Sequence, residues 1–335
     1  MNVLVTGGAG YIGSHAVRHL RAAGAHVVVA DNLKQGHRAA VPPDVPFYQV
    51  DLRQTETLRE ILASQRIDSV MHFAALACVP ESVTEPLRYY SNNVGGTLCL
   101  LEAMRATGVC KMVFSSTCAV IGVPSVLPIV ETSPREPINP YGWTKLVIEQ
   151  VLRDWSTADP EFGSVALRYF NVAGCAADGS LGEDHDPETH LIPILLQVAL
   201  GQRSHVTLFG NDYPTPDGTC IRDYVHVDDL CEAHVRVLKA MQPGKSAVYN
   251  VGIGRGYSVQ EVLEAARQVT GHLIPAQFGP RRPGDPPVLF ADARQLMTEL
   301  SWKPKFTDIR PIIETAWRWF RSHPAGYVDK SAPVQ

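Results

Sequence analysis

The 335-residue sequence predicts an α/β protein built on a doubly wound parallel sheet, with a smaller mixed α/β lobe toward the C-terminus. Short runs rich in Val and Ile alternate with helical patterns through the first half of the chain. A glycine-rich turn links the first of these runs to the first helical pattern. After Asn171 the sequence changes to shorter segments separated by loops rich in Gly, Asp and Pro, which predicts the second lobe.

The expected elements of the first half follow one another as strand, helix and strand. Runs that are apolar along their whole length are typical of parallel strands covered by helices on both faces. The predicted strands are 2–6, 26–30, 45–50, 69–73, 111–116 and 164–170. The predicted helices are 12–23, 56–64, 87–106 and one that opens at Tyr141.

The second half is predicted to contain a helix at 192–199, strands at 206–210 and 223–227, and then shorter alternating elements with prolines at 280–287. We therefore assign residues 1–170 to a first domain, to which 223–251 returns. Residues 171–222 and 252–335 are assigned to the second domain.

Composition argues against several classes of partner. The formal net charge of −4 gives no overall attraction to nucleic acid or to an anionic membrane, and no apolar run is long enough to span a bilayer. The seven cysteines form no CxxC pattern and their odd number leaves one unpaired, which favours reduced thiols. The chain enters a predicted strand at once, with no basic region or cleavage site before it. We expect a cytoplasmic protein.

The glycine-rich turn predicts a dinucleotide site of the Rossmann type. Gly7, Gly10 and Gly13 follow a predicted strand and open a predicted helix. Glycines at this spacing permit a tight turn, close approach of a pyrophosphate, and close packing of helix on strand. The helix N-terminus then offers N–H donors to the phosphates. A glycine-rich turn without a ligand is the less common alternative in this strand–turn–helix context.

Carboxylates after the next two strands bear on the choice of dinucleotide. Asp31 ends the second strand, where a carboxylate accepts hydrogen bonds from the adenosine ribose and repels a 2′-phosphate. This favours NAD over NADP, although Lys34 and Arg38 lie close in the sequence. Asp51 and Leu52 follow the third strand. Asp51 is interpreted equally well as a group that borders the adenine or as a helix N-cap.

Polar residues on the following elements predict an acid–base site. Ser115 and Thr117 lie at the carboxyl edge where α/β sheets bind ligands, and Tyr141 and Lys145 lie one helical turn apart on one face. A free tyrosine titrates near pH ~10, but a neighbouring ammonium and a cationic nicotinamide ring favour its phenolate form. Taken singly, each residue is better explained as a structural or solvated side chain. Together, downstream of a Rossmann turn, they indicate hydride transfer.

The sequence also resembles a known family. Its segments TGGAGYIG, HFAALA, SNNVGGT, FSST, PYGWTK, LRYFNVAG, FGNDYPTPDGTCIRDYVHVDDL and RRPGD have the order and spacing of the extended short-chain dehydrogenase/reductase family. Within this family the chain is similar to the UDP-glucose (UDP-galactose) 4-epimerases as far as about residue 325, and the long FGND segment is the most specific part. The resemblance implies an NAD-dependent enzyme that interconverts the two UDP-sugars through a transient 4-keto sugar.

The resemblance further implies a role for individual residues. Thr117 would be the catalytic Ser/Thr, Tyr141 the acid–base group, and Lys145 the residue that lowers the Tyr141 pKa and binds the nicotinamide ribose. The implied cofactor-binding residues are Gly7, Gly10, Tyr11, Ile12, Gly13, Asp31, Asn32, Asp51, Leu52, Phe73, Ala74, Ala75, Asn92, Ser115, Tyr141, Lys145 and Phe170. The implied substrate-binding residues are Thr117, Tyr141, Asn171, His190, Leu191, Thr207, Phe209, Arg222, Arg282, Asp285 and Leu289. A homodimer formed through the helices around 87–106 and 141–155 is also implied.

The chain departs from the family pattern at a few positions. Trp143 replaces a lysine often found inside the Tyr–Lys motif, Ile121 replaces a tyrosine after FSST, and Ala77 replaces a lysine near the phosphates. His190 stands where an asparagine commonly contacts the nucleotide sugar. Leu289 occupies the position that gates N-acetylated sugars, so the range of sugars stays open.

Other functions were weighed against this one. A sibling dehydratase or decarboxylase is disfavoured because Cys118, Ala119 and Val120, and no carboxylate, follow Thr117. A 4-epimerase of UDP-glucuronate, UDP-xylose or a UDP-N-acetylhexosamine stays open. A non-catalytic NAD-sensing protein is disfavoured by the intact Thr–Tyr–Lys set. The segments HVDD (226–229) and EDHD (183–186) lack the spacing of a zinc or di-metal site, so no metal is expected.

Overall fold

The apolar strands of the first half lie side by side in one parallel sheet. The computed structural model describes residues 1–282 and 285–328. Its seven-stranded sheet has the order β10-β6-β5-β4-β1-β2-β3. These strands are β1 (Asn2–Thr6), β2 (His26–Asp31), β3 (Phe47–Gln49), β4 (Ser69–His72), β5 (Lys111–Ser115), β6 (Gly163–Arg168) and β10 (Ser246–Asn250). The order reverses at β1, and ligands of such sheets bind outside the carboxyl ends of the strands at this switch point.

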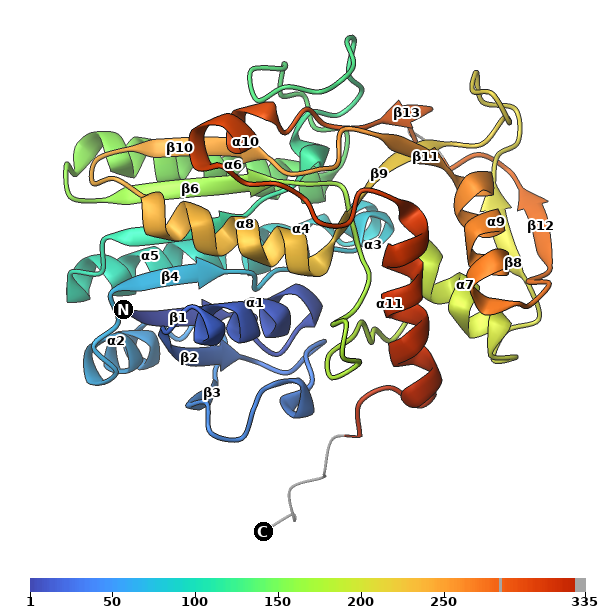
Figure 1. Ribbon diagram of the computed structural model, residues 1–335. Helices are drawn as coiled ribbons and strands as arrows, with labels where there is room; N and C mark the ends of the chain where they lie inside the picture. Colours follow the sequence, from blue (N-terminus) through green and yellow to red (C-terminus); the bar gives the residue numbers. More distant parts are fainter. Residues whose placement is uncertain (283–284, 329–335) are drawn as a thin grey trace.

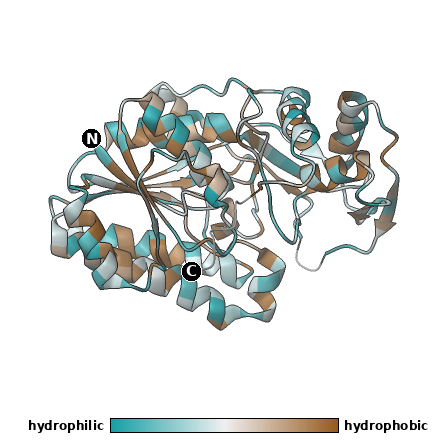
Figure 2. Ribbon diagram, turned by 90° about the horizontal axis from the view of Figure 1, so that it is seen from below, coloured by the Kyte–Doolittle hydropathy of each residue, from teal (hydrophilic) through white to brown (hydrophobic). Residues whose placement is uncertain are grey.

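Helices cover both faces of the large sheet because its strands are apolar on both sides. Val3 and Val5 pack toward one core and Leu4 toward the other, as the alternation of side chains along a strand requires. The first face carries α1 (Tyr11–Ala22), α8 (Val227–Ala240) and α10 (Arg294–Leu300). The second carries α2 (Thr55–Ser64), α5 (Gly96–Thr107) and α6 (Pro140–Ala158). Figures 1 and 2 show the sheet between these two layers, with hydrophobic strands in the middle.

The predicted helix 87–106 is interrupted in the structure. The chain forms α3 (Val79–Thr84), α4 (Pro86–Tyr89) and a π-helical turn η2 (Tyr90–Gly95) before α5 begins. The buried Asn93 side chain binds the backbone N–H and C=O of Leu76 at 2.8 and 3.0 Å. It also donates to the Thr144 hydroxyl at 3.1 Å, so the π-helical turn is connected both to the loop after β4 and to α6. Short 3₁₀ turns are η1 (Arg38–Ala40) and η3 (Cys118–Val120).

The smaller part of the molecule lies beyond the carboxyl ends of the large sheet (Figure 1). Its central strand β9 (Ile221–His226) pairs antiparallel with β11 (Gly256–Ser258) and parallel with β13 (Val288–Leu289) and β7 (Asn171–Ala173). A second, two-stranded parallel sheet consists of β8 (Val206–Phe209) and β12 (Ala276–Gly279). The helices α7 (Leu191–Ala199), α9 (Val259–Thr270) and α11 (Ile309–Ser322) enclose a separate apolar core.

The predicted fold class is confirmed: a Rossmann-type doubly wound parallel sheet carries a smaller mixed α/β lobe. Within the segment 223–251, α8 and β10 join the large sheet, whereas β9 pairs with strands of the smaller one. The division into domains at residues 170, 222 and 251 stays a prediction. In the described residues, no helix combines the length and apolar character that crossing a membrane would require.

Candidate active site

The turn from β1 into α1 is shaped by its three glycines. Gly7 has a φ of +72°, and a Cβ there would lie 2.5 Å from the Ala74 nitrogen. A Cβ on Gly13 would lie 2.0 Å from the Gly7 carbonyl oxygen, so this position holds helix against strand. A Cβ on Gly10 would meet only that same oxygen, at 3.4 Å. The described residues place no side-chain cap on α1, and the space beside Gly10 is open.

The loop after β4 approaches the same turn. The backbone nitrogens of Phe73 and Ala74 both donate to the Thr6 carbonyl, at 2.9 and 3.1 Å. Ala75 follows in the same half-buried stretch. Tyr11 and Ile12 begin α1, and the Tyr11 hydroxyl donates to the Gly174 carbonyl.

Asp31 supports the glycine turn from the end of β2. One carboxylate oxygen accepts from the Ala9 nitrogen at 2.9 Å, and the other accepts from the Leu33 nitrogen at 2.8 Å. Burial raises the pKa of Asp31 despite these hydrogen bonds. Arg38, which was considered as a phosphate partner, lies over the Phe47 ring at 4.7 Å and donates to the Val41 carbonyl.

The residues after β3 settle one of the two interpretations of Asp51. The N-cap of α2 is Gln54, so the N-cap interpretation of Asp51 was wrong. The Asp51 carboxylate instead binds the Arg53 guanidinium at 2.8 and 2.9 Å, which lowers its pKa, and lies 3.4 Å from the Asn32 amide. The helix begins later than a cap at Asp51 would need. Leu52 packs beside Gly96 at the start of α5.

The end of β5 and the start of α6 bring together four of the predicted residues. The Lys145 ammonium donates to the Ser115 carbonyl at 2.7 Å and lies 5.9 Å from the centre of the Tyr141 ring. Thr117 caps η3 by accepting from the Ala119 nitrogen at 3.1 Å, and its side chain also hydrogen-bonds Tyr141. The helix α6 begins here because Asn139 accepts from the Gly142 nitrogen and a proline occupies its first turn. The structure thus brings the predicted acid–base residues into one group, in which Ser115, Thr117 and Lys145 are buried and Tyr141 is half-buried.

In the chain without NAD, burial shifts the pKa values of both Tyr141 and Lys145. Burial raises the pKa of Tyr141 to about 12, and the hydrogen bond with Thr117 offsets this only in part. Burial also lowers the pKa of Lys145 to about 7, although the Glu149 carboxylate works in the opposite direction. The expected lowering of the Tyr141 pKa by Lys145 is therefore absent from the protein alone. A further positive charge beside Tyr141 is needed to favour its phenolate.

The smaller part of the molecule gathers a second set of predicted residues. The Arg222 guanidinium pairs with the Asp285 carboxylate, and the Arg282 guanidinium lies 4.3 Å from the centre of the Phe209 ring. Leu289 is paired with Arg222 in the β13–β9 register and packs on the apolar cluster of Val120, Ile121 and Ile129, as Phe170 does. Arg222 and Leu289 thus lie on paired strands of one sheet, whereas Phe209 lies on β8 of the two-stranded sheet and Arg282 in the loop after β12.

The remaining predicted residues are more scattered. Asn171 starts β7 opposite Tyr224 of β9, and Thr207 lies exposed on β8, two residues before Phe209. His190 is the N-cap residue of α7 and Leu191 its first residue. Asn92 lies in the π-helical turn, where its amide donates to the Asn93 side chain at 3.0 Å. No local sequence pattern had indicated that turn.

Comparison with known proteins establishes the family of the chain. Residues 3–252 match the NAD dependent epimerase/dehydratase family. The chain belongs to this family. UDP-glucose 4-epimerase of Lacticaseibacillus casei is 52% identical over 332 residues, covering 99% of this chain and 100% of that protein. A probable UDP-arabinose 4-epimerase of Oryza sativa subsp. japonica is 44% identical and covers 97% of this chain and 84% of its own.

A solved structure extends this likeness to three dimensions. The crystal structure of UDP-glucose 4-epimerase from Bifidobacterium longum, in complex with NAD⁺ and UDP, superposes with a TM-score of 0.94. It is 41% identical, and the match covers 98% of this chain and 100% of that one. The predicted membership of an epimerase family is thereby confirmed.

The glycine turn of this epimerase/dehydratase family member fits the dinucleotide that the family uses. A methyl group is excluded at Gly7 and Gly13 by the protein's own backbone, whereas the space at Gly10 is left free. That free space adjoins the first turn of α1, where N–H groups and the helix dipole favour phosphate. The carboxylate of Asp31 lies directly behind the turn, through its hydrogen bond with Ala9.

Sequence reasoning missed three buried groups that support the acid–base residues of this family member. Glu149, one helical turn after Lys145, binds the Arg168 guanidinium through both oxygens and accepts from the Ser116 hydroxyl at 2.6 Å. The Tyr169 hydroxyl hydrogen-bonds Ser115. Asn93 is the third. A signal existed for Glu149, because its spacing from Lys145 places both on one face of α6.

The two segments weighed for metal binding differ in the structure. In HVDD (226–229), His226 accepts from the Asp228 nitrogen at 3.0 Å and binds Thr315, and Asp229 accepts from the backbone of Lys305 and Phe306. Those side chains stabilise the fold through hydrogen bonds within the protein. The segment EDHD (183–186) contributes Glu183 and His185 to a larger group that the short segment did not reveal.

Proposed function

We propose that the chain is an NAD-dependent 4-epimerase that interconverts UDP-glucose and UDP-galactose through a transient 4-keto sugar. The observation that carries the proposal is the group that Thr117, Tyr141 and Lys145 form at the end of β5 and the start of α6. Relatives that bear the name UDP-glucose 4-epimerase match it over nearly their whole length at about half identity, which supports the same reaction.

Each residue of the acid–base group has a distinct part in this proposal. Tyr141 removes the proton of the sugar 4-hydroxyl, and Thr117 hydrogen-bonds the same hydroxyl. Lys145, fixed by the Ser115 carbonyl, holds the nicotinamide ribose. When bound, NAD supplies a hydride acceptor that is regenerated in every cycle, so no second redox substrate is needed. Its positive charge is also what the raised pKa of Tyr141 requires.

The dinucleotide is proposed to lie along the carboxyl edge of β1, β2 and β4. The turn of Gly7, Gly10 and Gly13 faces the pyrophosphate, and Asp31 the adenosine ribose. The other proposed contacts are Tyr11, Ile12, Asn32, Asp51, Leu52, Phe73, Ala74, Ala75, Asn92, Ser115 and Phe170.

The UDP-sugar is proposed to lie against the smaller sheets. Arg222 and Arg282 offer planar guanidinium donors suited to a pyrophosphate. Asp285, paired with Arg222, is the candidate for the uridine ribose, and Leu289 for the wall beside the sugar. The other proposed contacts are Asn171, His190, Leu191, Thr207 and Phe209. A UDP-pentose is the second candidate sugar, because the rice relative bears the name of a UDP-arabinose 4-epimerase.

The test is to incubate the purified protein with separate UDP-sugars and follow inversion at C4 by NMR. The panel contains UDP-glucose, UDP-galactose, UDP-arabinose, UDP-xylose, UDP-glucuronate and the two UDP-N-acetylhexosamines. The proposal expects UDP-glucose and UDP-galactose to interconvert fastest, without added NAD. Inversion of another sugar alone would move the proposal to that substrate. Absence of inversion in a protein that retains NAD would overturn it in favour of NAD sensing.

We also propose that the protein is a cytoplasmic homodimer. Leu87 and Leu98 on the helices after β4, and Trp143 on α6, are 83%, 41% and 44% exposed, so each of these helices presents apolar surface to solvent. A second copy pairing through these helices would cover them. All seven cysteines are free thiols, as a reducing compartment favours. Sedimentation that finds only monomer at micromolar concentration would contradict the dimer.

A further inference from the structure

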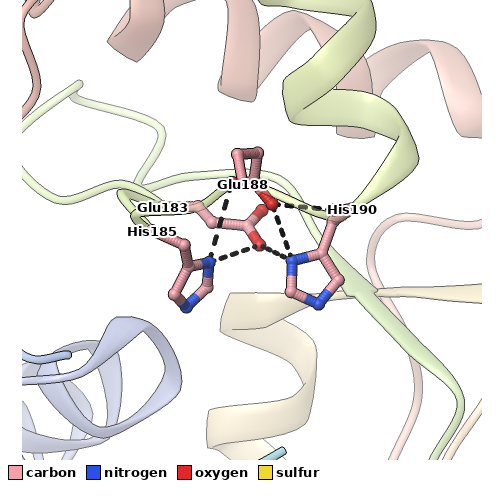
Figure 3. A group of neighbouring side chains, drawn as sticks. All are labelled: Glu183, His185, Glu188 and His190. Carbon is pink, nitrogen blue, oxygen red and sulfur yellow. Dashed lines mark hydrogen bonds and ion pairs between the residues drawn. The ribbon is translucent and has the colours of Figure 1, made fainter. Parts of the chain in front are cut away.

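Four side chains from the loop before α7 converge on one point. Glu183, His185, Glu188 and His190, which we call the His–Glu cluster, each direct one ligand-type atom inward, and these atoms all lie within 4.8 Å of one another (Figure 3). The residues are spaced two, three and two apart, which is no recognised metal motif. The fold of the loop, rather than a helix or strand period, brings them together.

The separations between these atoms suit a small metal ion. His190 Nδ1 lies 2.9 Å from an oxygen of Glu183 and 3.0 Å from one of Glu188. His185 Nδ1 lies 3.3 and 3.7 Å from oxygens of the same two carboxylates. A tetrahedral zinc site with bonds of about 2.0–2.1 Å separates its ligand atoms by about 3.3 Å. The four observed separations, which involve Oε1 of Glu183 and both oxygens of Glu188, bracket that value.

The two glutamates are already held in place for such a role. Their side chains are only 4% and 2% exposed, and one oxygen of Glu188 accepts from the backbone nitrogens of Thr189 and His190, each at 2.7 Å. The histidines are more exposed, so an ion and a water molecule can reach the cluster from solvent. Two buried carboxylates, that of Glu188 fixed by backbone donors, lie beneath accessible imidazoles and form a largely preorganised set of ligands.

One atom of the cluster lacks a partner of its own. His185 Nδ1 is buried and points into the cluster, where it faces carboxylate oxygens of Glu183 and Glu188 at 3.3 and 3.7 Å without a well-directed hydrogen bond to either. A buried ring nitrogen without a hydrogen bond is costly. A metal ion at the centre would use this lone pair. It would also neutralise the two buried carboxylates, which two protonated imidazoles would otherwise have to do.

We propose that the His–Glu cluster binds one divalent transition-metal ion, through Nδ1 of both histidines and one oxygen of each glutamate. Two imidazoles favour ions of the Zn²⁺ and Co²⁺ kind over Mg²⁺ or Ca²⁺. The ion is structural. His190 occupies the N-cap position of α7, and the His185 ring contacts the ring of Tyr11, the first residue of α1, edge to face with centroids 6.3 Å apart. It therefore joins the loop of the smaller lobe to the dinucleotide turn, whichever sugar the enzyme takes.

The test uses the whole protein with its bound NAD, treated with a chelator and then freed of it. Co²⁺ is titrated in, and the visible ligand-field absorption of tetrahedral Co²⁺ is followed. We expect the absorption to saturate at one equivalent per chain, to be displaced by Zn²⁺, and to be accompanied by a higher melting temperature. Absence of a saturating tetrahedral spectrum in the unmodified protein overturns the proposal, and leaves imidazolium–carboxylate pairs as the state of the cluster.

Variants locate the ion. His185→Gln and Glu188→Gln each remove one ligand, and each should weaken Co²⁺ binding at least as much as losing a hydrogen bond to a metal ligand, which costs roughly 10–100-fold. His26→Gln, at an exposed histidine of β2, is the matched control and should bind Co²⁺ as the parent does. NAD content confirms that each variant is folded. Unchanged binding in a folded His185→Gln protein would place the ion elsewhere, for example on the NAD phosphates, and overturn the assignment.

Discussion

The open space beside Gly10 allows the dinucleotide site to be tested without disturbing the fold. Gly10 has φ −79° and ψ 174°, which alanine adopts freely, and a Cβ there meets only the Gly7 oxygen at 3.4 Å. Gly10→Ala therefore adds a methyl group to a space that the protein itself does not fill. If a pyrophosphate lies against the α1 N-terminus, that methyl group collides with it.

The expected magnitudes separate binding from stability. Alanine gains about 0.4–1 kcal/mol through the unfolded chain and loses a similar amount as a poorer N-cap, so unfolding should change by less than about 1 kcal/mol. Overlap with a bound phosphate costs about 1–3 kcal/mol, which weakens NAD about 5- to 150-fold. Gly13→Ala is the contrast. Its Cβ would lie 2.0 Å from the Gly7 oxygen, so the helix itself must move and stability should fall by at least about 3 kcal/mol.

The assay combines three measurements on the same preparations. NAD released by denaturation gives its content, calorimetric titration of the NAD-depleted protein gives the dissociation constant, and thermal melting of the depleted protein gives stability. A Gly10→Ala protein that melts normally and retains NAD as the parent does would show that the pyrophosphate lies elsewhere. If Gly10→Ala unfolds as readily as Gly13→Ala, the space beside Gly10 is not open, and the reasoning fails at its first step.

Four further substitutions test the remaining parts of the site. Tyr141→Phe should lower kcat roughly 10²–10⁴-fold and Thr117→Val by less, and a parental rate for Tyr141→Phe would remove it from catalysis. Burial lowers the pKa of Lys145 from 10.5 to about 7. Between these two pH values the unfolded chain binds more protons than the folded chain, so the stability that is lost by burying Lys145 is recovered as pH rises. Lys145→Met should thus abolish epimerisation. It should also make the NAD-free protein more stable than the parent to urea at pH 7, by a difference in unfolding free energy that shrinks toward pH 10. A difference that grows with pH would contradict the lowered pKa of Lys145. Leu289→Ser should raise turnover of UDP-N-acetylgalactosamine while changing UDP-galactose by only the loss of one apolar contact, about 1–3 kcal/mol, and an unchanged preference in kcat/KM would show that Leu289 is no gate.

The large sheet was predictable because its strands have a clear sequence pattern. The central strands are buried on both faces, so runs such as 27–30 are continuously apolar, and the glycine turn marks where the first of them ends. The smaller sheet has no such signal. Its strand β13 contains only two residues and pairs with β9 from more than sixty positions away, so its existence depends on tertiary packing rather than local preference.

The candidate site also contains residues with a local sequence signal and residues that only tertiary packing brings together. The Thr117, Tyr141 and Lys145 group was predictable because helix period and strand ends place its members. Asp51 was ambiguous because both interpretations depended on where α2 begins, and a single sequence places helix ends poorly. The His–Glu cluster was missed because its members share no period, and only the path of the loop brings Glu188 and His190 to Glu183. The phenolate form of Tyr141 stays a prediction for the NAD-bound protein, because in the chain by itself burial raises the pKa of Tyr141.

The interleaving of the two sheets limits how such an enzyme can be rebuilt. The chain passes from β9 of the smaller sheet through α8 and β10 of the large one, and returns to the smaller sheet at β11. A hybrid gene with a single crossover cannot exchange the smaller lobe as a unit, because it would also replace β10, whose partner β6 comes from the other parent. At least two separate blocks, on either side of 227–250, would have to be exchanged together. New sugar preferences should therefore arise more readily by point substitution on the lining strands than by gene shuffling.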